Sequence, residues 1–141
     1  MIKQISVFLQ NEKGRLEKLI YILSENDLNI RALSIADTEE FGVLRLIVND
    51  PDKAKNVLNE KGFRVSETEV IAVEVPDVPG GLAGALHKLT EKGINIDYMY
   101  AFLTKKSDFA NVIFRVEDTQ KAEEVLNAAG VKVLGGESVY M

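Results

Sequence analysis

The stretch from Val73 to Leu82 combines residue types that suggest ligand chemistry. A β-rich run ends there, Asp77-x-Pro79-Gly80 predicts a turn, and an amphipathic helix pattern begins directly afterwards. A helix start presents unpaired backbone N–H groups and a partial positive charge, which together favour a bound carboxylate. Asp77 adds an oxygen acceptor beside this anion site, and that combination suits an α-amino acid. The predicted ligand contacts of this turn are Asp77, Gly80, Gly81 and Leu82.

A related frame occurs earlier in the chain, where Asn11 stands three residues before Gly14. A glycine at such a position lets the backbone or a ligand approach closely. The predicted ligand contacts of this first turn are Asn11, Gly14, Arg15 and Leu16. These residue types also have a more common use, in which the Asp or Asn caps a helix and the glycine only makes the turn. From these residues alone, both interpretations stay open.

The two turns belong to an internal repeat that runs through the chain. At an offset of 66 residues Val7 matches Val73, and after a two-residue insertion near Lys105-Lys106 the offset is 68. Further matched positions are Gly14 with Gly80, Leu23 with Leu89, Asn29 with Asn95, Asp50 with Asp118, Leu58 with Leu126, and Gly62 with Gly130. The sequence therefore predicts two units, residues 1–67 and 68–141, joined without a Gly/Ser linker and packed closely.

Each unit is predicted to follow the order strand, helix, strand, strand, helix, strand. In the first unit the predicted strands cover residues 2–9, 29–36, 41–48 and 63–65, and Asp50-Pro51 begins the second helix. With right-handed crossovers this order closes into an antiparallel sheet with both helices on one face, a ferredoxin-like α+β unit. We expect two such units to form a pseudo-two-fold pair. Apolar spacing predicts that the helices bury Leu16, Leu19, Ile20, Leu23, Ala54, Val57, Leu58, Leu82, Ala85, Leu86, Leu89, Ala122, Val125, Leu126 and Ala129.

The composition of the chain argues against several classes of function. The 141 residues carry a net charge of −5, which makes nucleic acid an unexpected partner. No apolar run is long enough for a membrane helix and no signal-peptide pattern is present, so we expect a cytoplasmic protein without membrane contact. The chain has no Cys and a single His, His87, so no metal or cofactor is expected. Nucleophile, Walker and Rossmann motifs are also missing, so the sequence does not predict an enzyme.

The pattern Asp77-x-Pro79-Gly80-x-Leu82, followed 15 residues after the glycine by Asn95-Ile96, resembles the ACT domain. The first unit repeats the frame as Gly14-x-Leu16 and Asn29-Ile30, with Lys13 in place of the proline. The resemblance covers essentially the whole chain as two ACT repeats. It implies regulatory binding of small ligands, usually amino acids, at interfaces between ACT units.

The resemblance also implies that a polar residue of the first loop and the Asn of the second strand hold the ligand. These positions are Asn11 and Asn29 in the first unit, and Asp77 and Asn95 in the second. Asn is disfavoured in strands, yet it recurs here in both units. The alternative is that each Asn only begins its strand and bonds the nearby turn.

We therefore expect a small sensor protein that binds a free amino acid at the interface between ACT units and signals through association or a partner protein. The expected partners are the amino acid, a second copy of the chain in a homodimer, and a regulated enzyme. The alternative is a ligand-free ACT scaffold that regulates an enzyme by protein–protein contact through an exposed sheet edge. Stabilisation of the isolated protein by a small ligand distinguishes the two.

Overall fold

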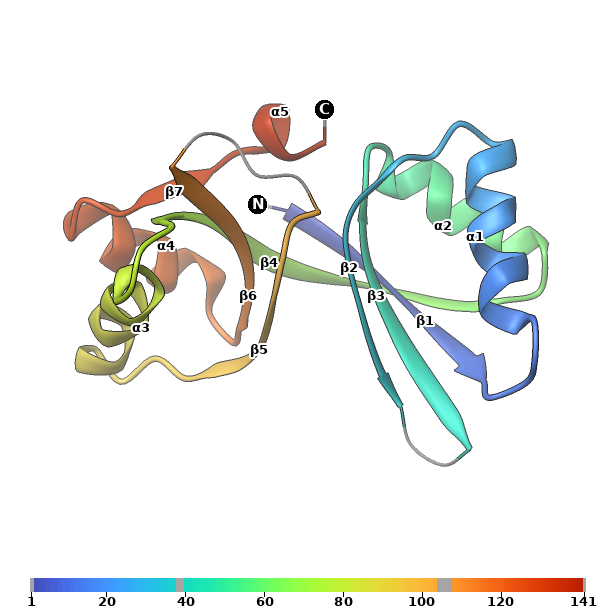
Figure 1. The fold of residues 1–141 in the computed structure, drawn as a ribbon, viewed down its shortest axis with the longest axis horizontal. Helices are drawn as coiled ribbons and strands as arrows, with labels where there is room; N and C mark the ends of the chain where they lie inside the picture. The colour runs from blue at the N-terminus through green and yellow to red at the C-terminus, as the bar shows by residue number, and fades with distance from the viewer. Residues whose placement is uncertain (1, 38–39, 104–107, 141) are drawn as a thin grey trace. The chain divides into compact units, whose positions relative to one another are not determined.

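The computed structural model describes residues 2–37, 40–103 and 108–140 (Figure 1). The chain divides into two compact units. The N-terminal unit comprises residues 3–68 together with Tyr140, and the C-terminal unit comprises residues 69–139 together with Ile2. The predicted insertion at Lys105-Lys106 lies outside the described residues. None of the helices in the described ranges is both long enough and apolar enough to cross a membrane.

The N-terminal unit is an antiparallel sheet with two helices. Its elements are β1 (Ile2–Gln10), α1 (Arg15–Glu25), β2 (Ile30–Asp37), β3 (Phe41–Val48) and α2 (Pro51–Glu60), followed by β4 (Arg64–Pro76). Strand β3 lies between β1 and β2 and is antiparallel to both, while β4 borders β1 on its other side. This is the strand order of a ferredoxin-like unit.

The C-terminal unit repeats this arrangement. Strand β4 is followed by α3 (Gly81–Glu91), β5 (Ile96–Ala101), β6 (Phe109–Val116), α4 (Thr119–Ala128) and β7 (Lys132–Leu134). Strand β6 lies between β4 and β5, and β7 pairs with the other edge of β4. A short helix that the sequence did not predict, α5 (Gly136–Val139), ends the unit. The ferredoxin-like fold expected from the sequence is confirmed for both units.

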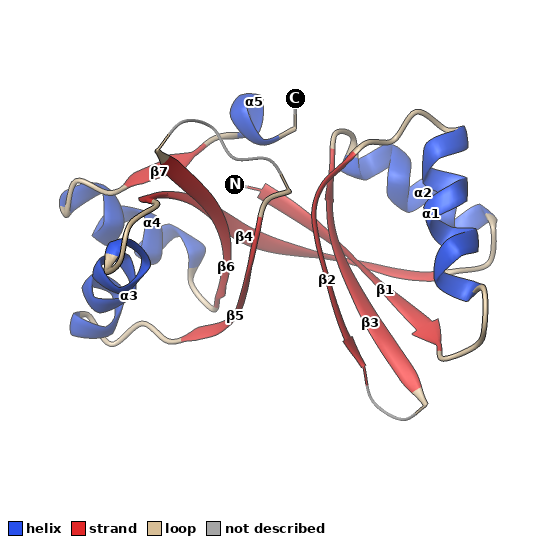
Figure 2. Cartoon of the chain, in the orientation of Figure 1, coloured by secondary structure: helices blue, strands red, loops and turns tan. Residues whose placement is uncertain are grey.

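In each unit both helices cover one face of the sheet (Figure 2). Ile5, Val7 and Leu9 alternate along β1 and pack beneath α1 and α2. Their antiparallel partners on β3 complete the same apolar layer. The equivalent layer of the C-terminal unit comes from β4 and β6. The fully or largely buried members of the two layers include Ile5, Val7, Leu44, Leu46, Leu19 and Leu58, and Ile71, Val73, Val112, Phe114, Leu89 and Leu126.

In each unit, one aspartate caps the second helix. Asp50 is the N-cap of α2 and accepts a hydrogen bond from the Lys53 amide at 3.1 Å. Asp118 is the N-cap of α4 and accepts one from the Lys121 amide at 3.0 Å. The helix start predicted at Asp50 is thereby confirmed, because the carboxylate satisfies one of the backbone donors that a helix start leaves unpaired.

Replacing Asp118 with alanine should destabilise the protein by about 1 kcal/mol, since the helix loses this cap. Asp118→Ser keeps a side-chain oxygen acceptor and should retain most of that stability. Urea unfolding followed by circular dichroism measures both variants. Equal destabilisation by alanine and serine would contradict the role given to the carboxylate.

Some sequence expectations about the helices and strands were wrong. Leu16 is 41% exposed instead of buried, because it lies in the first turn of α1 and the neighbouring Arg15 covers the core residue Phe63. Ala129 is exposed because it is the C-cap residue of α4 and lies beyond its last turn. The strand predicted over residues 63–65 is the start of β4, which continues to Pro76 and passes through the predicted boundary between residues 67 and 68. No Gly or Pro interrupts this stretch before Pro76, so nothing ends the strand.

Candidate functional site

The turn between β4 and α3 leaves backbone donors without backbone partners. Gly80 is the N-cap residue of α3 and has a left-handed backbone with φ of +87°. The amide of Gly81 donates to the Val78 carbonyl at 3.0 Å, and the amide of Gly84 donates to the Gly80 carbonyl at 2.9 Å. Within the residues that the structure describes, the amides of Leu82 and Ala83 have no backbone acceptor. These two N–H groups at a helix start can receive a carboxylate.

Gly81 is fixed by the close approach of the preceding strand. A Cβ atom at this position would overlap the backbone carbonyl of Pro76, so no other residue fits without a movement of the turn. Gly80 has open space around it and is instead required by its positive φ. The glycine pair thus serves two different purposes, and together they bring the helix start directly against the end of β4.

A cavity of about 440 Å³ opens beside this turn, within the C-terminal unit. Gly80, Gly81 and Gly84 form one wall, and Phe109 lies in another. The cavity has charges of both signs, because Lys88 lines it together with the pair Lys132–Glu74, whose charged atoms are 3.8 Å apart. Its volume is in the range of small-molecule sites. Mixed charge and glycine walls fit a small zwitterion.

Asp77 lies at the rim of the turn and is exposed. Its backbone amide donates to the carbonyl of Asp108 at 2.8 Å, which fixes the residue to the start of β6. The N-cap residue of α3 is Gly80, which has no side chain, so Asp77 does not occupy the N-cap position. The capping interpretation left open by the sequence therefore lacks its ordinary geometry here.

The first turn has the same backbone but a different side chain at its centre. Gly14 is the N-cap residue of α1 with φ of +83°, and the amide of Arg15 donates to the Glu12 carbonyl at 3.2 Å. In the described part of the chain the amides of Leu16 and Glu17 have no backbone acceptor. Arg15 occupies the position of Gly81, and its guanidinium lies 4.2 Å from the centre of the Phe63 ring.

The two predicted Asn residues stand immediately before the second strand of each unit. Asn29 precedes β2, and its backbone N–H donates a hydrogen bond to Oδ1 of Asn49 at 2.9 Å. Asn95 precedes β5, and its Nδ2 donates to Oδ1 of Asp97 at 3.3 Å. Both residues are exposed. These local hydrogen bonds agree with the interpretation that each Asn begins its strand. Because both residues are exposed, their side-chain amide groups are also accessible to a ligand.

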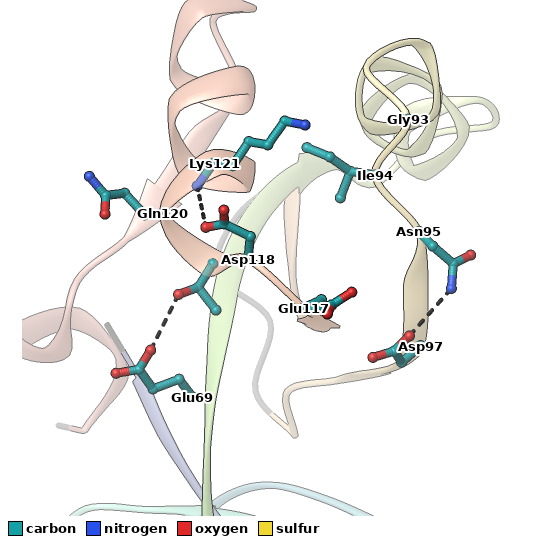
Figure 3. Close-up of a pocket in the computed structure, with 10 residues that line it drawn as sticks. Glu69, Gly93, Ile94, Asn95, Asp97, Glu117, Asp118, Gln120 and Lys121 are labelled. Atoms are coloured by element: carbon teal, nitrogen blue, oxygen red, sulfur yellow. Dashed lines mark hydrogen bonds between the residues drawn. The ribbon is translucent and has the colours of Figure 1, made fainter.

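Asn95 also lines an acidic cavity of about 730 Å³ at the start of β5 and α4 (Figure 3). Its walls carry the carboxylates of Glu69, Asp97, Glu117 and Asp118. Glu69 accepts a hydrogen bond from the Thr119 hydroxyl at 3.3 Å, and Asp118 caps α4. Asp97 accepts hydrogen bonds from Asn95 and, at 3.0 Å, from the guanidinium of Arg115. Three of the four carboxylates are thus already engaged in local contacts.

Within one unit, Asn95 and the Gly80 turn lie at opposite ends of the sheet. Pro76, before the turn, pairs with Phe109, whereas Ile96, after Asn95, pairs with Val116. Phe109 and Val116 are the two ends of β6, so at about 3.4 Å per residue they are roughly 24 Å apart. The N-terminal unit has the same register, with Gln10 paired to Phe41 and Ile30 to Val48. One amino acid cannot touch both predicted positions of a single unit.

Sequence reasoning missed the side chains that surround the two turns. Phe109 and Lys132 line the cavity of the C-terminal unit, and their equivalents at the 68-residue offset, Phe41 and Arg64, line a cavity of the N-terminal unit. The repeat could have identified these residues, because one of the two equivalent positions is Phe in both units and the other is cationic in both units. His87 lies on the exposed side of α3, where its side chain is 66% accessible and its Nε2 atom is 2.9 Å from Oε1 of Glu91.

Comparison with known proteins gives a consistent result. The family model described as ACT domain pair matches residues 1–139. The crystal structure of protein BT0572 from Bacteroides thetaiotaomicron is 40% identical, with a TM-score of 0.93 and coverage of 99% of this chain and 95% of that one. The regulatory subunit of aspartate kinase from Thermus thermophilus, in its ligand-free form, has the same fold at 17% identity, with a TM-score of 0.66 and coverage of 90% and 91%. No curated protein matches the chain.

Proposed function

Because the chain belongs to the family of ACT domain pairs, we propose that it is a regulatory protein that senses a free amino acid. The proposal places the amino acid at the turn between β4 and α3. The observation that carries it is the turn itself: the amides of Leu82 and Ala83 have no backbone acceptor among the described residues, and Gly80 and Gly81 line a cavity of about 440 Å³. The protein signals the bound state through association or through a partner, without catalysing a reaction.

Each charged end of an amino acid has a matching group at this turn. The carboxylate accepts hydrogen bonds from the free amides at the start of α3, where the helix dipole adds attraction. The ammonium lies near the carboxylate of Asp77, and the side chain extends into the cavity toward Phe109. Loss of either charged group from the ligand should therefore weaken binding.

We further propose that Asn95 or Asn29 contributes from a different ACT unit than the one that supplies the turn. The separation of roughly 24 Å along β6 makes this necessary if one ligand is to touch both positions. A second copy of the chain can supply that Asn, so binding and dimer formation would be linked by differential affinity. Analytical ultracentrifugation with and without ligand measures this linkage.

A second function is favoured by the edge strands. Among the described residues, strand β2 has β3 as its one neighbour in the sheet order, and Leu33 and Ile35 of β2 are 36% and 50% exposed. An unpaired edge with exposed apolar residues can accept a strand from another protein. In this case the protein would act as a ligand-free scaffold for a regulated enzyme.

Calorimetric titration of two variants tests the amino-acid site. Asp77→Ala should weaken binding of the amino acid about tenfold or more, because a charged hydrogen-bond partner is lost. Asn95→Ala should weaken it by a similar factor and leave the free energy of unfolding nearly unchanged, since Asn95 is exposed. The control is Asn127→Ala, an exposed Asn on α4 of the same unit. Unchanged affinity in both site variants would refute the assignment.

A further inference from the structure

The N-terminal unit contains a second cavity that the amino-acid site does not use. It has a volume of about 600 Å³ and lies between the end of β1, the start of α1 and the start of β4. Two guanidinium groups, those of Arg15 and Arg64, and two aromatic rings, those of Phe8 and Phe41, line it. Gln10 and Gly62 complete the part of the wall relevant to binding.

The two arginines are held by aromatic contacts and not by acidic partners. Arg15 lies 4.2 Å from the centre of the Phe63 ring, and Arg64 lies 5.2 Å from the centre of the Phe8 ring. The Nε atom of Arg15 is buried and has no hydrogen-bond partner among the described residues. Within those residues, neither guanidinium has an ion-pair partner, and no carboxylate lines the cavity. A buried donor without a partner is unfavourable, so an acceptor from a ligand would stabilise the site.

The repeat supplies an internal comparison for this cavity. Its equivalent in the C-terminal unit is the cavity of about 440 Å³ at the Gly80 turn. There Glu74 stands at the position of Phe8 and Lys132 at that of Arg64, and the two form an ion pair of 3.8 Å. Gly81 replaces Arg15. The same place in the fold thus contains an acidic residue, paired with Lys132, in one unit, and two guanidinium groups, with no carboxylate among the described lining residues, in the other.

We propose that the N-terminal cavity binds an organic carboxylate that has an aryl group and no ammonium group. A guanidinium can hold a carboxylate by two parallel hydrogen bonds. The rings of Phe8 and Phe41 are 43% and 50% exposed, and they offer the apolar surface on which an aryl group packs. An ammonium group has no acidic partner in this wall and would be repelled by two guanidinium charges. The site is independent of the amino-acid site proposed above.

The probe for this site is 3-phenylpropionate, added to the ¹⁵N-labelled protein. The amides of Gly62 and Gly130 report the two cavities separately, since each glycine lines one of them. The expected result is a saturable shift of the Gly62 signal with little change at Gly130. L-Phenylalanine has the same skeleton with an added ammonium and should bind at Gly62 at least about tenfold more weakly. Inorganic phosphate, which has no apolar part, should be weaker still.

Charge-neutralising variants complete the test. Arg64→Gln and Arg15→Gln should each weaken 3-phenylpropionate binding about tenfold or more, as expected for loss of a charged hydrogen-bond donor. Lys132→Gln is the control at the equivalent position of the other cavity and should leave the Gly62 response unchanged. The amide spectrum of each variant shows directly whether it is folded. Binding that survives both arginine substitutions, an absent Gly62 response at millimolar probe, or equal affinity for L-phenylalanine or phosphate would overturn the proposal.

Discussion

Replacing Gly81 with alanine is expected to destabilise the C-terminal unit by roughly 2–4 kcal/mol, a large effect for the addition of one methyl group. The added Cβ would overlap the Pro76 carbonyl, which belongs to the backbone at the end of β4 and cannot move without disturbing the strand. The turn would have to open, and the amide geometry at Leu82 and Ala83 would change with it. Chemical denaturation and the loss of ligand binding both measure this effect.

Gly84→Ala is the matched control for this prediction. Gly84 lies in the same helix and lines the same cavity, but a Cβ at its position meets no atom within 4 Å. Alanine is a better helix former than glycine, so this variant should be neutral or more stable by up to about 1 kcal/mol. Similar unfolding midpoints for the two variants would show that the close approach at Gly81 does not constrain the turn.

Phe114→Ala is expected to destabilise the protein by about 3–5 kcal/mol. Phe114 is fully buried on β6, opposite Ile71 of β4, and belongs to the apolar layer beneath α3 and α4. Its removal leaves a void in a layer that two helices cover, and a well-packed core closes such a void only in part. Urea unfolding followed by far-UV circular dichroism gives the free energy.

The control is Phe109→Ala, which removes the same side chain from the same strand. Phe109 is 42% exposed and lines the cavity of the C-terminal unit, so its removal should destabilise the protein by about 1 kcal/mol or less. We expect it to reduce amino-acid binding instead. Equal destabilisation by Phe109→Ala and Phe114→Ala would contradict the assignment of Phe114 to the core and of Phe109 to the binding cavity.

Much of the fold could be predicted from the sequence because its signals are local and occur twice. Strand β3 covers the predicted residues 41–48, and Asp50 caps α2 as its position before Pro51 suggested. The left-handed residue after α1 is Asp27, with φ of +56°, and Asp is one of the few non-glycine residue types that adopt this conformation readily. Ile5, Val7 and Leu9 alternate along β1, which is the pattern of a half-buried strand, and they pack beneath the helices. Each of these features depends on neighbours within a few residues.

The features that could not be predicted depend on pairing between distant segments. The overlap that restricts residue 81 to glycine arises from the path of β4 relative to α3, which no local pattern encodes. The continuation of β4 from Arg64 to Pro76 joins two predicted strands that each looked complete. The distance between Asn95 and the Gly80 turn follows from the register of β6 with its neighbours. Residue type alone therefore identified candidate ligand contacts but not which of them one ligand can reach.

The central claim is that this ACT domain pair binds a free amino acid, and a thermal-shift screen of the purified protein against the twenty amino acids tests it most directly. A ligand present at about 100 times its dissociation constant adds roughly 2.7 kcal/mol of stability. For a chain of this size, that raises the unfolding temperature on the order of 5–12 °C. The account predicts such a shift for one amino acid or a small related group, and its loss in Asp77→Ala. A screen in which none of the twenty amino acids changes the unfolding temperature would contradict the claim.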